Sequence, residues 1–175
     1  MLDSIVAATP ADLETLWQLY ADVCAQQEHD AYTPQWTQGV YPTIDDLRAH
    51  VDAGDMYVGT LDGRFVAAMV LTPHEDPEYL DVPWPTACAQ DEVAVIHLLA
   101  VHPSMRGKHL GAELVREAIA LARKDGKRVI HLDVVPGNLA ASRIYRDAGF
   151  VPVGTYQIFY EDTGLADFDM YERVL

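Results

Sequence analysis

The stretch VAVIHLLAVHPSMRGKHLGAELV, residues 93–115, decides the fold class of this chain. It begins with nine almost continuously apolar residues, which is typical of a central strand covered on both faces. A short basic loop follows, and apolar residues then recur at helical spacing from Leu110 to Ala122. A buried strand that turns directly into a helix indicates a crossover connection, and therefore an α/β (α+β) domain.

The flanking segments extend this pattern to a mixed sheet. The Asp62-Gly63 pair lies between two β-rich runs and is a strong hairpin signal. Thr43 and Asp46 form a capping pair at the start of a predicted helix that stops at Gly54. The patterns predict helices near residues 10–24, 43–54, 110–126 and 138–149, and strands near residues 56–72, 93–101, 128–135, 155–161 and 167–175. Residues 4–8 form a short apolar stretch ahead of these elements. We expect a central sheet of about seven strands flanked by about four helices.

Composition sets the broad class. The chain has 175 residues, of which 50% are hydrophobic, so we expect one domain over residues 1–175. It has no signal segment and no apolar run long enough to span a bilayer, which predicts a cytoplasmic protein that does not bind membranes. Cys24 and Cys88 lie far apart without CxxC spacing, so we expect reduced thiols and no metal site.

The charge is unevenly distributed. The formal net charge is −15, which argues against nucleic acid as a partner. Residues 106–146 hold nine of the twelve basic residues and four acidic ones, so this segment is +5 and the remainder is −20. Solvated helix faces account for part of this excess. Beside Gly107 and Gly111, however, Arg106 and Lys108 favour an anion site.

The loop before residue 110 has the properties of a phosphate site. The first backbone N–H groups of a helix lack partners and lie at the positive end of its dipole. Glycines at 107 and 111 allow a close approach of the backbone to an anion. The sequence lacks both GxxxxGK(S/T) and an opening GxGxxG, which excludes the two most familiar nucleotide loops.

Two pieces of sequence resemble the acetyl-CoA-binding core of the GNAT superfamily of N-acetyltransferases. LAVHPSMRGKHLGAELV is similar to the family's pyrophosphate loop, Q/R-x-x-G-x-G/A, with Arg106 in the first position and Gly111 in the last. HLDVVPGNLAASRIYRDAGF is similar to the strand and helix that carry N-x-x-A-x-x-x-Y-x-x-x-G-F. Together the two pieces cover roughly residues 93–150, and both at this spacing are a specific signal.

The resemblance implies acetyl-CoA as cofactor and a set of residues that bind it. A backbone N–H near Leu99 would stabilise the oxyanion that forms as an amine attacks the thioester. The implied cofactor-binding residues are Leu99, Ala100, Val101, Arg106, Gly107, Lys108, His109, Leu110, Gly111, Ala112, Asn138, Ala141 and Tyr145.

His109 departs from the family pattern, which commonly has Gly at this position. A non-Gly residue with positive φ would cost roughly 1 to 2 kcal/mol. We therefore expect the backbone at His109 to be helical or close to it, and assign no role to its side chain.

The catalytic candidates differ in how the sequence supports them. Tyr145 matches the family's general acid, since a phenol can protonate the leaving thiolate; packing in the core is the alternative. His97 within the apolar strand and Glu92 at its start are equal candidates for the base. Asp133 on the neighbouring strand is a third. A hydrogen-bonded core histidine and a solvated strand end are the alternatives for His97 and Glu92.

The resemblance implies that two irregular segments, residues 26–42 and 73–91, form the acceptor pocket. The length of the second segment is typical of a lid. Their aromatics and the neighbouring carboxylates would suit a cationic amine, or else the aromatics plug the core. The predicted substrate-binding residues are Trp36, Tyr41, Tyr79, Trp84 and Asp133.

The sequence therefore predicts an N-acetyltransferase that moves acetyl from acetyl-CoA to a primary amine of a small molecule or peptide by direct attack in a ternary complex. The alternative is a non-catalytic CoA-binding sensor or interaction module on the same fold. A nucleotide-phosphate binder would fit the loop but leave Asn138 and Tyr145 unexplained. By analogy with relatives, residues 155–161 and 167–175 allow a homodimer.

Overall fold

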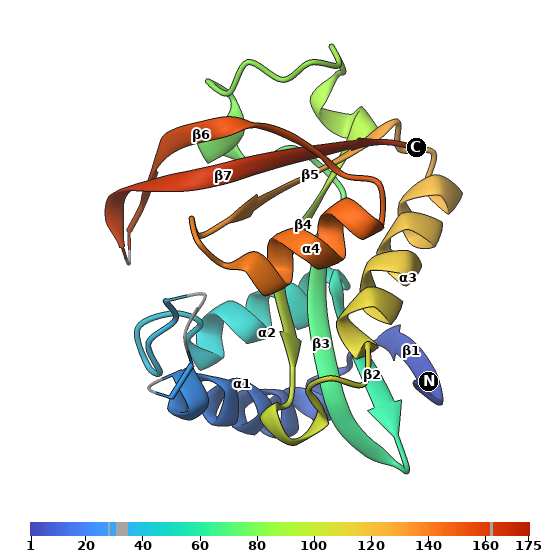
Figure 1. Cartoon of the computed structure of the whole chain (residues 1–175). Helices are drawn as coiled ribbons and strands as arrows, with labels where there is room; N and C mark the ends of the chain where they lie inside the picture. The colour runs from blue at the N-terminus through green and yellow to red at the C-terminus, as the bar shows by residue number, and fades with distance from the viewer. Residues whose placement is uncertain (28, 31–34, 162) are drawn as a thin grey trace.

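A computed structural model describes residues 1–27, 29, 30, 35–161 and 163–175 (Figure 1). The described chain folds into a seven-stranded mixed sheet with the order β1-β2-β3-β4-β5-β7-β6. The strands are β1 (Ser4–Ala7), β2 (Met56–Leu61), β3 (Arg64–Thr72), β4 (Val93–Val101), β5 (Val129–Val134), β6 (Val151–Tyr160) and β7 (Gly164–Val174). The helices are α1 (Leu13–Gln27), α2 (Ile44–Ala53), α3 (Leu110–Lys124) and α4 (Leu139–Asp147), with short 3-10 turns between elements. The expected mixed α/β sheet is confirmed.

Local signals in the sequence explain where the elements begin and end. Asp62 and Gly63 both have positive φ and turn β2 into β3, as the hairpin signal predicted. The Thr43 hydroxyl accepts the N–H of Asp46, and the Asp46 carboxylate accepts the N–H of Thr43 in return, which fixes the start of α2. β6 begins at Val151 and β7 at Gly164, both earlier than expected, because Val151 to Gly154 pair with β7 and Gly164 to Ala166 pair with β6.

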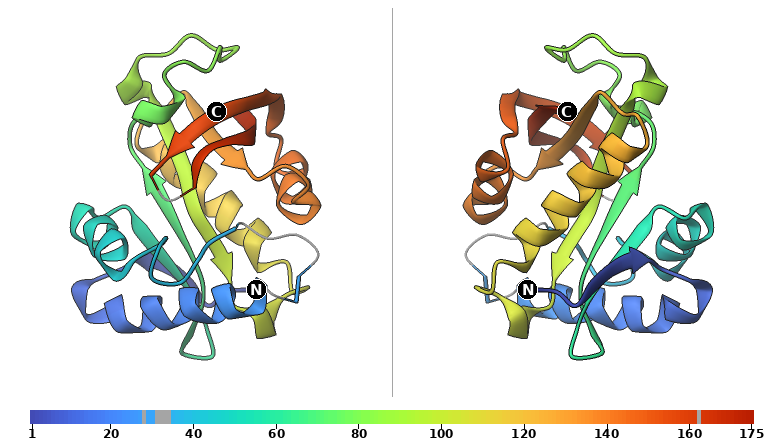
Figure 2. Two further views of the ribbon diagram at one scale, coloured as in Figure 1. Left: turned by 90° about the vertical axis from the view of Figure 1, so that its left-hand side faces the viewer. Right: turned by 90° about the vertical axis from the view of Figure 1, so that its right-hand side faces the viewer.

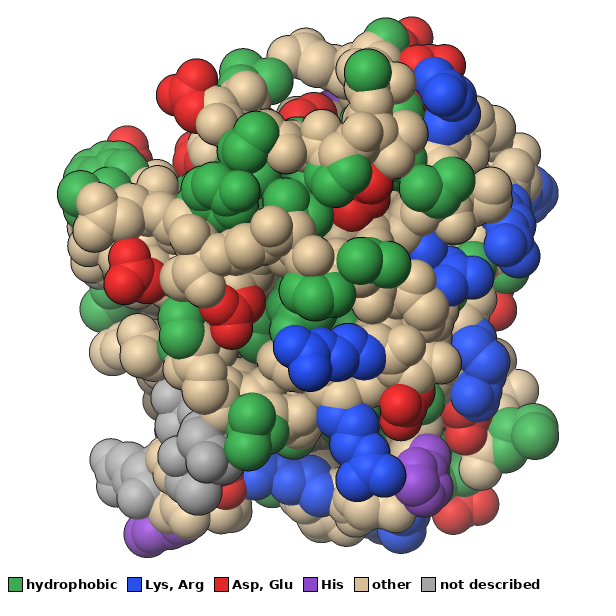
Figure 3. Space-filling model, turned by 45° about the horizontal axis from the view of Figure 1, so that its top comes forward, with side chains coloured by type: hydrophobic (Ala, Val, Ile, Leu, Met, Phe, Trp, Pro, Cys, Tyr) green, Lys and Arg blue, Asp and Glu red, His purple; other side chains and the backbone are tan. Residues whose placement is uncertain are grey.

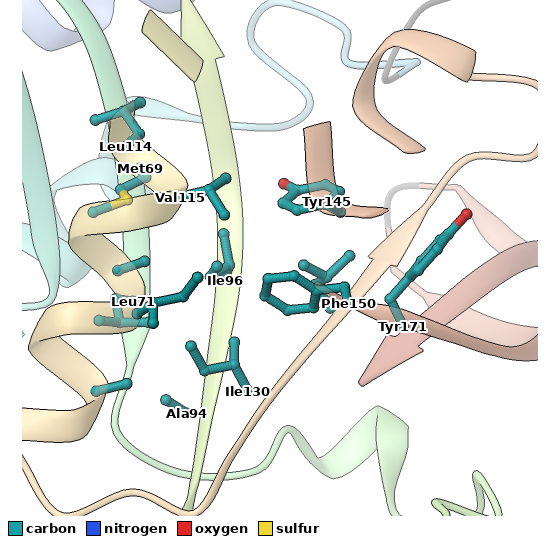
Figure 4. Close-up of a cluster of buried hydrophobic side chains, with 14 of the residues drawn as sticks. Met69, Leu71, Ala94, Ile96, Leu114, Val115, Ile130, Tyr145, Phe150 and Tyr171 are labelled. Carbon is teal, nitrogen blue, oxygen red and sulfur yellow. The ribbon is translucent and has the colours of Figure 1, made fainter. Parts of the chain in front are cut away.

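The helices cover opposite faces of the sheet (Figure 2). α1 and α2 lie on one face, whereas α3 and α4 lie on the other. Side chains alternate along the strands accordingly: Ala68 and Val70 pack toward α1, whereas Met69 and Leu71 pack toward α3. Figure 4 shows the second of these cores, where Leu114 and other α3 residues meet β3 and β4.

The two central strands diverge, and this divergence positions the site. β4 and β5 run parallel from Val93 opposite Val129 to Val95 opposite His131. Beyond this point β4 follows β3, whereas β5 follows β7 as far as Val134 (Figure 2). Among the described strands, none pairs with the facing edges of β4 and β5 past these residues.

None of the described helices combines the length and the apolar character that a bilayer crossing requires.

Candidate active site

A cavity of about 590 Å³ opens where β4 and β5 part. One wall is β4 from Ile96 to Leu99, and the facing wall is the end of β5 from Asp133 to Val135. The remaining walls come from the start of α4, the segment before α2 and the turn between β6 and β7. Elements far apart in the sequence therefore meet at one hollow, which both predicted cofactor pieces border.

A β-bulge at Leu98 gives β4 its shape at the cavity. Leu98 has a φ of 49°, and Leu98 and Leu99 together lie between the pairs Val70–His97 and Ala68–Ala100. The hydroxyl of buried Tyr20 donates to the Leu98 carbonyl at 2.6 Å. Because of the extra residue, His97 and Leu98 both face the α1 side of the sheet, and Leu99 faces the α3 side.

His97 is the centre of a polar cluster in the cavity wall. Its Nε2 lies 2.8 Å from Oδ2 of Asp76, which reaches it from the segment before β4. Burial by itself lowers the pKa of His97, but the hydrogen bond and the negative charge of Asp76 outweigh it. The Asp133 and Glu78 carboxylates act in the same direction, so the pKa of His97 is raised above its ordinary value.

Asp133 forms the second half of this cluster. Its Oδ1 accepts a hydrogen bond from the Tyr79 hydroxyl, and the Tyr160 hydroxyl lies 3.5 Å from both of these oxygens. Burial raises the pKa of the Asp133 carboxyl, against the lowering effect of His97. Burial and the Asp133 charge also raise the pKa of both tyrosines, so their hydroxyls stay protonated. The cluster places negative charge beside an imidazole at the cavity.

Tyr145 borders the cavity from α4. Its ring packs edge-on against Phe150 at 5.5 Å, and Figure 4 shows its hydroxyl directed toward β4, away from the core below. Burial, with the Asp133 charge, raises the pKa of Tyr145, so the phenol keeps its proton at neutral pH. The side chain thus packs in the core and also presents its hydroxyl to the cavity.

The loop before α3 differs from the sequence prediction at His109. His109 has φ 60° and ψ 17°, which is left-handed, so the expectation of a helical backbone there is wrong. The chain turns sharply between the 3-10 turn at residues 103–105 and Leu110, and His is among the non-Gly residues that adopt this region most readily. Within the described chain, no side chain caps α3, so its first amides remain available for an anion.

Other loop residues are placed as follows. A Cβ on Gly111 would lie 3.2 Å from Cδ1 of Ile144 and 3.8 Å from Leu99, so glycine lets α3 lie close to β4 and α4. Arg106 pairs with Asp30 at 2.6 Å, and Lys108 lies over the sulfur of Met105. Asn138 caps α4 by accepting the N–H of Ala141, and both line the cavity.

The remaining predicted residues are only partly brought together. Trp36, Tyr41 and Asp133 line the cavity, and Tyr79 reaches it through Asp133. Trp84 instead stacks on His131, with ring centroids 3.5 Å apart. Its side chain therefore covers the core and does not border the cavity.

Glu92 lies away from the cavity. It precedes β4, about 20 Å along the strand from Leu98 at the usual rise per residue. A hydrogen bond from the Ala89 N–H, with Arg128 at 3.2 Å, lowers the pKa of Glu92. The structure thus brings His97, and not Glu92, to the site.

Sequence reasoning missed two members of the cluster. Asp76 lies within the irregular segment 73–91, and Tyr160 lies within the predicted strand 155–161. No local signal identifies either one, because each is brought to the cavity by contacts between distant segments.

Comparison with known proteins identifies the family. Residues 16–150 match the model of the acetyltransferase (GNAT) family. The chain belongs to this family. A stretch of 70 residues, 40% of the chain, is 37% identical to an uncharacterised N-acetyltransferase of Methanocaldococcus jannaschii and covers 31% of it. Another of 75 residues, 43% of the chain, is 33% identical to the N-alpha-acetyltransferase RimI of Mycobacterium tuberculosis and covers 46% of it. The chain thus spans less than half the length of these relatives.

Solved structures of this family share the whole fold. An acetyltransferase of Streptococcus agalactiae superposes with a TM-score of 0.81 at 16% identity, over 100% of this chain and 98% of that one. A structure from Salmonella typhimurium, determined with its cofactor acetyl-CoA, has a TM-score of 0.70 at 20% identity, over 98% and 93% of the two chains. The GNAT fold expected from the sequence is confirmed.

The backbone at His109 is testable by substitution. We expect His109→Val to lower the free energy of unfolding by about 1 kcal/mol or more, because a β-branched residue is disfavoured in the left-handed region. His109→Gly should match or exceed the wild type, since glycine adopts this conformation without a steric cost. Urea unfolding of the three proteins measures the order, and a Val variant as stable as the Gly variant would contradict the left-handed assignment.

Proposed function

We propose that the protein is an acetyl-CoA-dependent N-acetyltransferase that acts on a primary amine of a cationic acceptor by direct attack in a ternary complex. The observation that carries this proposal is the cavity between β4 and β5, which has the His97 cluster on one side and Tyr145 on the other. The acetyl-CoA of the Salmonella relative and the amine-directed names of the curated relatives support it.

The residues of the site fit acetyl-CoA. We infer that the unpaired edge of β4 beyond the bulge hydrogen-bonds the pantetheine and that a backbone N–H near Leu99 stabilises the developing oxyanion. The uncapped amides of α3, beside Gly107 and Gly111, suit the pyrophosphate. Arg106 is already paired with Asp30, so its charge is secondary to the backbone.

His97 is the base in this proposal. In its neutral form it takes one proton from the acceptor ammonium, and the amine nitrogen then attacks the thioester carbonyl carbon. The C–N bond forms, the C–S bond breaks, and Tyr145 delivers a proton to the departing thiolate. The second proton of the amine nitrogen then passes to the Tyr145 phenolate, which leaves a neutral amide and restores the phenol. The Asp133 carboxylate and the rings of Trp36 and Tyr41 are placed to hold a cation before it loses its proton.

The charge pattern supports a cationic acceptor. On the face drawn in Figure 3, Lys and Arg side chains gather in the lower and right-hand parts, and the upper left part shows hydrophobic and acidic side chains. Asp46, Asp133 and Glu161 contribute three carboxyl groups to the cavity lining. Such a field attracts ammonium groups and favours an amine of a polyamine or a basic peptide.

The non-catalytic alternative does not account for the His97 cluster. A module that only bound CoA would need the loop before α3 and the β4 edge, but not an imidazole paired with a buried carboxylate at the cavity. The cytoplasmic location and the homodimer remain predictions. The exposed apolar side chains of Val151, Phe159 and Leu165 on β6 and β7 favour the dimer.

A screen for thiol release tests the enzymatic function. With acetyl-CoA and a panel of polyamines, aminoglycosides, amino acids, lysine peptides and peptide N-termini, we expect turnover on at least one cationic amine. Tyr145→Phe should lower kcat by roughly 100-fold, as loss of a general acid does, with little change in acetyl-CoA affinity. Tyr57→Phe, a tyrosine outside the cavity, is the matched control. Tight CoA binding without turnover on any amine would favour the non-catalytic module.

The pH dependence tests His97 as base. Because the pKa of His97 is raised, kcat/KM should be low where the imidazole is protonated and rise through a midpoint above the ordinary histidine value. Asp76→Asn removes the carboxylate that contributes most to raising this pKa and leaves the effect of burial, so the midpoint should move to lower pH. His97→Gln should abolish this limb of the profile. An unchanged limb in His97→Gln would assign the base elsewhere.

A further inference from the structure

The segment between β3 and β4, here called the strap (residues 73–91), carries two members of the polar cluster. Asp76 binds His97, and Tyr79 donates to Asp133. The strap forms an extended excursion at one end of the sheet (Figure 1), with short 3-10 turns as its regular structure. These contacts can form only if further contacts fix the position of the strap relative to β4 and β5.

His131 of β5 provides that attachment. Its ring is 1% exposed, and its Nδ1 lies 2.7 Å from Oε2 of Glu75 on the strap. Its Nε2 lies 3.2 Å from Oε2 of Glu172 on β7. Trp84 of the strap stacks on the same ring at 3.5 Å and 7°, and the Thr86 hydroxyl donates to Glu172 Oε1 at 2.7 Å. The strap is thus bound to the sheet on both sides of its midpoint.

The hydrogen-bond donors and acceptors around His131 explain why this attachment is strong. A carboxylate only accepts, so both ring nitrogens of His131 donate when both neighbours are ionised, which requires the imidazolium form. The two carboxyl groups are 7% and 6% exposed, and removing the ring between them would leave buried carboxyl oxygens without their donor. Within the described residues, the other oxygen of Glu75 is buried without a hydrogen-bond partner, so Glu75 depends on His131.

The attachment lies directly beside the catalytic pair. Glu75 immediately precedes Asp76 on the strap, and His131 precedes Asp133 by two residues on β5, so both histidine clusters occupy the same face of the sheet. We propose that His131 is a positioning residue for acetyl transfer, which fastens the strap so that Asp76 is held against His97. This inference rests on the proposed function only for its effect on turnover, because the position of Asp76 can be measured without it.

The titration of His97 followed by NMR is the direct test. The charged groups that act on its ring are Asp76 and Glu78 of the strap and Asp133 of β5, and the Tyr79 ring lies 6.2 Å from it between centroids. The Tyr79 and Tyr160 hydroxyls contact Asp133. His131→Gln should move the His97 midpoint to lower pH in the same direction as Asp76→Asn. In the double variant the His97 midpoint should lie no lower than in Asp76→Asn alone, because both changes remove the same contact, that between Asp76 and His97. A midpoint that moves in Asp76→Asn but stays at the wild-type value in His131→Gln would overturn the proposal.

A second pair of variants covers the case in which His131→Gln fails to fold. Trp84→Ala removes the stacking ring and should shift the His97 midpoint in the same direction, whereas Trp84→Phe, which keeps a stacking ring, should restore it. His74→Gln, at an exposed strap histidine, is the matched control and should titrate as the wild type. Equal midpoints in Trp84→Ala and the wild type would count against the proposal.

Kinetics separate this inference from the proposed function. If the proposed function and the positioning role of His131 both hold, Trp84→Ala and His131→Gln lower kcat/KM for the amine by up to about 100-fold. The KM for acetyl-CoA stays unchanged. If His97→Gln retains full activity while the titration shifts appear, the positioning stands and the assignment of the base fails. If the shifts are absent and His97→Gln is inactive, the base stands and the positioning role fails.

Discussion

The parting of β4 from β5 beyond Val95 is the constraint on which the site depends. Parallel strands normally continue to pair, and unpaired backbone groups at the centre of a sheet are costly unless something satisfies them. Here the bulge at Leu98 keeps β4 on β3, and the Tyr20 hydroxyl satisfies the Leu98 carbonyl. The separation leaves a hollow between the two strands, which Tyr145 of α4 borders, and α3 with its uncapped first amides follows β4 after the loop of residues 102–109. The proposed binding and chemistry are thus built on strands of the packed sheet.

The charge distribution differs between the two binding regions that we propose. Backbone dipoles and glycines dominate where a polyanion is expected, and carboxylates with aromatic rings dominate where a cation is expected. Removing these carboxylates from water costs free energy, and each of them has a hydrogen-bond partner. Tyr79 contacts Asp133, His97 contacts Asp76, and His131 contacts Glu75. Histidines on two neighbouring strands thus bind two carboxylates of the strap, beside the contact of Tyr79 with Asp133. This arrangement links the fold of an irregular segment to the protonation of the proposed base.

Much of the fold was predictable because its signals are local. The Asp62-Gly63 turn, the Thr43 cap and the apolar run of β4 each depend on neighbouring residues, and each is confirmed. The left-handed backbone at His109 was not predictable, because a histidine in a loop has no unique conformation. The Asp76–His97 pair and the contact between Tyr160 and Asp133 were also out of reach, since they join distant segments. Trp84 shows the same limit: a loop aromatic can line a pocket or cover a core, and here it covers His131.

The central claim is that acetyl-CoA binds between β4 and β5 with its thioester between His97 and Tyr145. A crystal structure with bound acetyl-CoA tests it most directly. We expect the pantetheine to hydrogen-bond the free edge of β4 beyond Leu98, the pyrophosphate to contact the amides before and within the first turn of α3, and the thioester sulfur to lie within reach of the Tyr145 hydroxyl. A cofactor bound outside the gap between the strands, or one whose sulfur lies far from Tyr145, would contradict the claim.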